Sequence, residues 1–101
     1  MSLVTNVLLL VDSEDEPGVP EIQNWLAAEE YGQLVEVSKH AGGRKAMECR
    51  VWAGAFNHLD TEAFVSCARG AKWERIESVQ LLIREEDDAG FWLAFGNMEA
   101  A

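Results

Sequence analysis

Hydrophobic and polar positions change their period along this chain, and each change marks an expected element. Residues 4–11 (VTNVLLLV) form a nearly continuous apolar run with β-branched members, which predicts a strand buried on both faces at the centre of a sheet. Residues 12–20 combine a charge cluster with both prolines of the chain and predict a loop. Residues 21–31 repeat apolar side chains at helical spacing, which predicts a short amphipathic helix that ends at Gly32.

The middle of the chain has the alternation that is typical of a hairpin. Residues 33–39 alternate and predict a strand, and the paired glycines within 41–44 favour a tight turn. The returning strand is expected over residues 45–57. Its odd positions are apolar and mostly small, whereas its even positions include Trp52 and Phe56. We interpret the odd face as packed under helices and the even face as the mixed, aromatic one.

The second predicted helix has the clearest start signal in the chain. Asp60 is a suitable N-cap, and Leu59 and Phe64 have the spacing of a hydrophobic staple around it. Apolar residues then follow at helical spacing, and Gly70 is expected to end the helix.

Two further strands, at 78–84 and 90–95, flank an acidic turn. The resulting order predicts one α+β domain over residues 1–101, a ferredoxin-like two-layer sandwich. It consists of a βαββαβ unit with an extra C-terminal edge strand, and two helices cover one face of an antiparallel sheet. Another small α+β arrangement with helices on one sheet face is the alternative.

The charge of the chain limits the kinds of partner that it can bind. There are 18 acidic residues against 8 Lys and Arg, a formal net charge of −10, yet 49% of the residues are hydrophobic. The apolar content excludes a disordered acidic tail. The negative field disfavours nucleic acid and anionic membranes and favours a cationic protein. With no membrane-length apolar run and no signal-peptide pattern, we expect a cytoplasmic protein of bacterial type.

The acidic residues gather in two clusters, which the predicted topology puts at opposite ends of the sheet. We interpret both as candidate surfaces for a basic partner, and they consist of Asp12, Glu14, Asp15 and Glu16, and of Glu85, Glu86, Asp87 and Asp88. At opposite ends the clusters could not share a metal ion, and neither has the spacing of a calcium loop. We therefore expect no metal site.

A second candidate surface is the sheet face that no helix covers. Alternation within each strand assigns to it Leu8, Leu10, Arg50, Trp52, Phe56, Leu82, Arg84 and Trp92. An apolar patch of this kind usually marks an interface, and Trp, Arg and Phe dominate interface energetics. A second copy of the chain, a different protein or ligand, and a covering loop or C-terminal segment are the three possible occupants.

Catalytic chemistry has little support in the sequence. His40 and His58 are expected far apart, and Cys49 and Cys67 are expected to be reduced thiols that pack under or within the helices. His58 beside Asp60 is the best acid–base pair, although helix capping explains Asp60 more simply. No spacing points to a metal, a cofactor or an activated nucleophile, so no catalytic residue is assigned.

These observations predict a non-catalytic interaction module that binds a basic protein, as immunity proteins and nuclease inhibitors do. The alternative is a homodimeric ferredoxin-like domain that uses the open sheet face to bind a small ligand or to perform catalysis.

Overall fold

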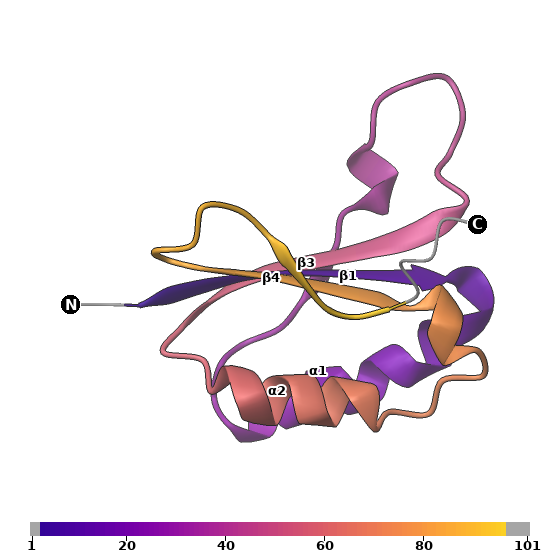
Figure 1. Cartoon of the computed structure of the whole chain (residues 1–101). Helices are drawn as coiled ribbons and strands as arrows, with labels where there is room; N and C mark the ends of the chain where they lie inside the picture. Colours follow the sequence, from indigo (N-terminus) through magenta and orange to yellow (C-terminus); the bar gives the residue numbers. More distant parts are fainter. Residues whose placement is uncertain (1–2, 97–101) are drawn as a thin grey trace.

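The chain forms two layers, a five-stranded antiparallel sheet and two helices that lie against one of its faces (Figure 1). The computed structural model describes residues 3–96. In their order across the sheet, the strands are β2 (Val35–Glu36), β3 (Cys49–Asn57), β1 (Val4–Asp12), β4 (Gln80–Glu85) and β5 (Trp92–Phe95). The helices are α1 (Val19–Ala28) and α2 (Thr61–Arg69).

Strand β1 is central, as predicted, but only one of its faces is deeply buried. Thr5, Val7, Leu9 and Val11 are each at most 4% exposed, whereas the residues between them are half-buried. The expectation of burial on both faces is therefore wrong. Both helices lie on the same side of the sheet, so nothing within residues 3–96 packs as a layer on the other side (Figure 1). We call this uncovered side the open face.

The segment before α1 is more ordered than the predicted loop. Residues Ser13–Gly18 form a 3₁₀ helix that runs directly into α1, and Pro20 occupies the first turn of α1. Proline fits this position because the first turn of a helix needs no backbone donor there.

The predicted hairpin is shorter than expected. Strand β2 has two residues, because the chain turns into a 3₁₀ helix at Ser38–His40. Residues 41–48 are all exposed and extend from the sheet on the side away from the helices (Figure 1). Pairing resumes only at Cys49, where β3 begins.

The strand register reverses the predicted faces of β3. Trp52 lies opposite Leu9 of β1, and Phe56 lies opposite Thr5. Directly opposite residues in an antiparallel pair share a face, so both aromatic side chains belong to the helix-covered side. Phe56 is 3% exposed and is part of the core.

The physical reason for this arrangement is side-chain volume. The side chains at the odd positions of β3 are too small to fill the space under the helices, whereas the even positions include the large rings of Trp52 and Phe56. Gly54 makes room for one of them, since a Cβ at Gly54 would lie 2.6 Å from Cζ of Phe56. The bulky face of β3 therefore packs against the helices, and the small face is open.

Helix α2 has the predicted ends. The Asp60 Oδ1 atom accepts a hydrogen bond from Ala63 N at 3.2 Å, and Gly70 is the C-cap. Leu59 and Phe64 are both buried, as the staple requires. The main core fills the space between the sheet and the two helices, and Phe64, Leu9, Ile22 and Leu26 are among its fully buried members.

Candidate functional site

The first acidic cluster follows β1, and its carboxylates are largely engaged within the protein itself. Asp12 caps the 3₁₀ helix, with Oδ1 accepting a hydrogen bond from Ser13 N at 2.9 Å. Glu14 is exposed, and no side-chain hydrogen bond or ion pair involves it within residues 3–96. Of the four predicted partner-binding residues here, Glu14 is thus the one with an unengaged side chain.

Asp15 is a structural residue, which corrects its assignment to a partner-binding surface. Its side chain is 2% exposed. Oδ1 accepts hydrogen bonds from Glu74 N at 2.6 Å and Arg75 N at 3.2 Å, and Oδ2 accepts one from Ser78 Oγ at 2.7 Å. Burial by itself raises the pKa of Asp15, but these hydrogen bonds and the Arg75 charge outweigh it and lower the pKa below the ordinary value of 3.8.

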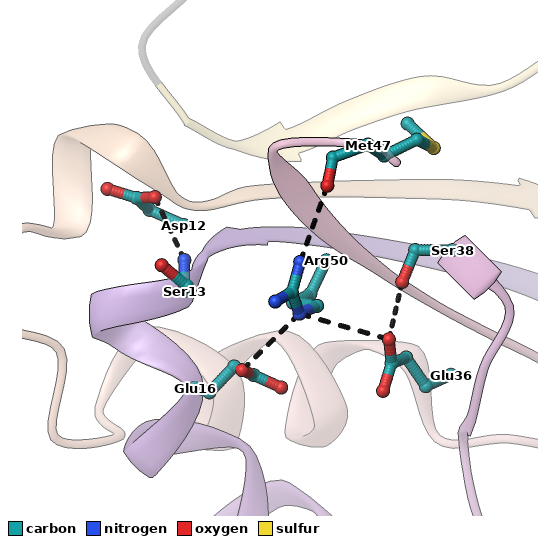
Figure 2. A network of polar contacts seen from close by, with 7 residues as sticks. All are labelled: Asp12, Ser13, Glu16, Glu36, Ser38, Met47 and Arg50. Carbon is teal, nitrogen blue, oxygen red and sulfur yellow. Dashed lines mark hydrogen bonds and ion pairs between the residues drawn. The ribbon is translucent and has the colours of Figure 1, made fainter. Parts of the chain in front are cut away.

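Glu16 is part of an ion-pair network on the helix-covered side of β3 (Figure 2). Arg50 Nε lies 3.6 Å from Glu16 Oε1 and 3.9 Å from Glu36 Oε2. Ser38 Oγ donates a hydrogen bond to the same Glu36 oxygen. Arg50 was expected on the open face, and its position here is a second consequence of the reversed register of β3.

The second acidic cluster is the turn after β4, which we call the acidic turn (residues 85–88). Glu85, Glu86 and Asp87 are exposed, and Asp88 is half-buried. Glu86 Oε1 accepts a hydrogen bond from Val4 N at 3.1 Å, and Asp88 Oδ2 accepts from Glu85 N at 2.9 Å and Trp92 Nε1 at 3.0 Å. These donors are neutral. Among the described residues, no ion pair involves the turn.

The acidic turn borders a hollow of about 260 Å³ at one end of the sheet. Its lining comes from the start of β1, the segment that leads into α2 and the acidic turn itself. The lining residues are Leu3, Val4, Thr5, His58, Leu59, Thr61, Glu85, Glu86, Asp87 and Asp88. The sequence indicated the charge but not the hollow, because the hollow depends on three segments that are far apart in the chain.

His58 lines this hollow, and no hydrogen bond or ion pair joins its side chain to that of Asp60 within residues 3–96. Asp60 caps α2, and the Tyr31 hydroxyl donates to His58 O at 3.3 Å and accepts from Asp60 N at 3.1 Å. His58 has a left-handed backbone, with φ of 55°. That conformation lets β3 turn sharply into α2. The Asp60 side chain therefore has a structural explanation.

The open face has a different membership from the predicted one. Leu8, Leu10, Leu82 and Arg84 lie on it, as expected. Arg50, Trp52, Phe56 and Trp92 do not, and the last of these lies opposite the core residue Ile83. Sequence reasoning missed several residues of this face, among them the apolar Val35, Val51, Ala53 and Leu93. Their apolar character was visible, but their face was not.

Trp52 and Trp92 each line a surface hollow on the helix-covered side. Trp92 and α2 residues such as Val65 and Arg69 line one of about 260 Å³. Trp52 lines another of about 350 Å³ beside the start of α1, and its buried Nε1 has no hydrogen-bond partner among residues 3–96. The two tryptophans therefore do not form one aromatic surface.

The two cysteines are free thiols of intermediate burial. Cys49 lies opposite Asp12 on the open side, not under the helices as expected. Burial and the nearby Glu21 charge raise the pKa of Cys67, which favours the protonated thiol over the reactive thiolate. In the described part of the chain no group of three or more His, Cys, Asp and Glu side chains is placed to hold a metal ion.

Neither helix within residues 3–96 has the length and apolar character needed to cross a membrane. Comparisons with protein-family models, with curated proteins and with solved structures gave no match to this chain.

Proposed function

We propose that this protein is a non-catalytic interaction module that binds a basic protein through the acidic turn, as immunity proteins and inhibitors bind their targets. The observation that carries the proposal is that the four carboxylates at 85–88 lie together without a paired cation in the described part of the chain. They border one hollow, and no cation of residues 3–96 pairs with them. Three carboxylates of the first cluster, all but that of Glu14, are instead engaged by capping, burial or Arg50.

A Lys or Arg side chain is the natural occupant of this hollow. Its charged end would meet the carboxylates of the acidic turn, and its aliphatic stem would contact Leu3, Val4 or Leu59. Arginine is favoured over lysine, since its planar guanidinium can bind a carboxylate with two parallel hydrogen bonds. The net charge of −10 would accelerate association with a cationic surface before any contact forms.

The proposed architecture is a ferredoxin-like sandwich with an added edge strand. The strand order β2-β3-β1-β4-β5 supports it, since removing β5 leaves the arrangement of a βαββαβ unit. A cytoplasmic location is part of the proposal and agrees with the two cysteines being free thiols. The fold by itself does not specify function, and the acidic turn is the feature that supports it.

Affinity capture with three forms of the protein tests the proposal. The wild type should capture a basic protein, and the variant Glu85→Lys/Asp87→Lys should not. Both substituted side chains are exposed, and neither accepts a hydrogen bond in the structure. The matched control, Glu29→Lys/Glu30→Lys, makes the same charge change at exposed positions after α1 and should retain capture. Equal loss in both variants would show that only net charge matters and would refute a site at the turn.

A further inference from the structure

The strand residues of the open face are nearly free of charge on a strongly acidic protein. Leu8, Leu10, Val51, Ala53 and Leu82 form its centre, spread over three adjacent strands. Only two charged residues of the strands face this side, Asp12 and Arg84, so the strand residues of the face sum to zero charge while the whole chain carries −10. Depletion of charge around an apolar centre is the compositional signature of a protein interface.

The two charges lie at opposite ends of the face. Asp12 is the last residue of β1, whereas Arg84 of β4 lies opposite Asn6, near the start of β1. The two positions are six residues apart along β1, which is about 20 Å at the usual rise per residue. They therefore cannot pair within one chain, and no ion pair involves either of them in residues 3–96.

We propose that the open face binds the open face of a second copy of this chain, with the strands of the two sheets antiparallel across the interface. A two-fold axis that lies between the sheets and perpendicular to the strands brings Asp12 of each copy to the end of the sheet where Arg84 of the other copy lies. The apolar centre then packs on itself, and two equivalent Asp12–Arg84 pairs form, as a two-fold interface requires.

The area agrees with this occupant. Strand spacing and rise give the five strands roughly 500 Å² of flat face per copy, or about 1,000 Å² for two, which is near the lower limit for a specific interface. Residues 41–48, which carry Arg44, Lys45 and Glu48, extend on the same side of the sheet and are not counted in this area (Figure 1). A strongly basic partner would find no acidic surface at this centre, which argues for a second copy here. The acidic turn stays available for the proposed function, on which this inference does not depend.

Charge reversal in a pair of variants tests the proposal. Arg84→Asp places two acids on each face, and Asp12→Arg places two bases on each face, so each variant should weaken self-association by at least about tenfold. An equimolar mixture of the two should form a heterodimer, because both of its pairs are again acid with base. Light scattering after size exclusion measures this, with the wild type expected at twice 11.2 kDa.

Control measurements keep the test decisive. Asp12 also caps a 3₁₀ helix, so thermal unfolding must show that Asp12→Arg is folded. Lys72→Asp, an exposed substitution in the segment after α2, should leave the dimer intact. A monomeric wild type over a range of concentrations would overturn the proposal. So would a dimer that survives both charge reversals, or a mixture of the two folded variants that stays monomeric.

Discussion

Asp15 and Ser78 are joined by a hydrogen bond of 2.7 Å, from the Ser78 hydroxyl to the buried Asp15 carboxylate. Asp15 lies in the 3₁₀ helix after β1, and Ser78 lies just before β4, 63 residues later. The same carboxylate accepts from two backbone N–H groups of the segment that links α2 to β4. One acidic residue therefore holds that connection against the start of α1.

Replacing Asp15 with Asn should lower the free energy of unfolding by about 2–3 kcal/mol, because the amide cannot accept all three hydrogen bonds and leaves a buried donor unsatisfied. Denaturant unfolding monitored by tryptophan fluorescence measures the loss. Glu14→Gln is the control at an exposed neighbouring position and should change stability by less than about 0.5 kcal/mol. Equal stability of the two variants would contradict the structural role of Asp15.

The lowered pKa of Asp15 also predicts a pH dependence. The folded state holds the carboxylate charged below the ordinary pKa of 3.8. The stabilisation is therefore complete above that value and is lost as the pH falls through the lower pKa of the folded state. The difference in stability between the wild type and Asp15→Asn should narrow when the urea midpoint is followed from about pH 5 to about pH 2. A difference that stays constant over this range would contradict the assignment.

Gly18 is sterically required next to Trp73. A Cβ at this position would overlap the indole ring, which is fixed by a hydrogen bond of 2.7 Å from Trp73 Nε1 to Ala68 O. We expect Gly18→Ala to destabilise the protein by about 1–3 kcal/mol through overpacking. Gly42→Ala is the matched control, since nothing lies within 4 Å of its would-be Cβ. Thermal unfolding of both variants decides the point, and equal midpoints would refute it.

The role of Asp60 as the N-cap of α2 can be tested by substitution. Asp60→Ala should cost about 1 kcal/mol by removing the acceptor for Ala63 N. Asp60→Asn keeps a capping oxygen while it removes the charge, so its stability should stay close to that of the wild type. If Asp60→Asn were as destabilised as Asp60→Ala in chemical denaturation, charge rather than capping would explain the residue.

Features that depend on neighbouring residues could be predicted from the sequence. The start of α2 at Asp60 and its end at Gly70 are set by contacts within a few positions, and the structure confirms both. The α+β class and the antiparallel sheet follow similarly from the order of local patterns.

Features that depend on distant residues could not be predicted in this way. Alternation shows which residues of β3 share a face, but not which face the helices cover. That choice follows from packing volume, since the Phe56 ring and the Leu34 side chain both lie within 3.2 Å of where a Cβ of Gly54 would be. The burial of Asp15 is of the same kind, because its three hydrogen-bond donors lie 59 to 63 residues away in the sequence.

The acidic turn could be identified from the sequence alone, since its four acidic residues are consecutive. What composition could not show is that this cluster is unpaired within residues 3–96 whereas the first is mostly engaged. For Glu16 the difference depends on Arg50, which β3 directs toward Glu16 and Glu36 (Figure 2).

A residue-resolved titration with an oligoarginine peptide tests whether the acidic turn binds cationic side chains. Amide chemical shifts in ¹H–¹⁵N NMR spectra should change most at residues 85–88 and 58–61, and the changes should saturate. They should disappear in Glu85→Lys/Asp87→Lys and persist in Glu29→Lys/Glu30→Lys. Shifts that centre on Glu14, or that are unchanged by reversing the charges of the turn, would contradict a cation-binding site there.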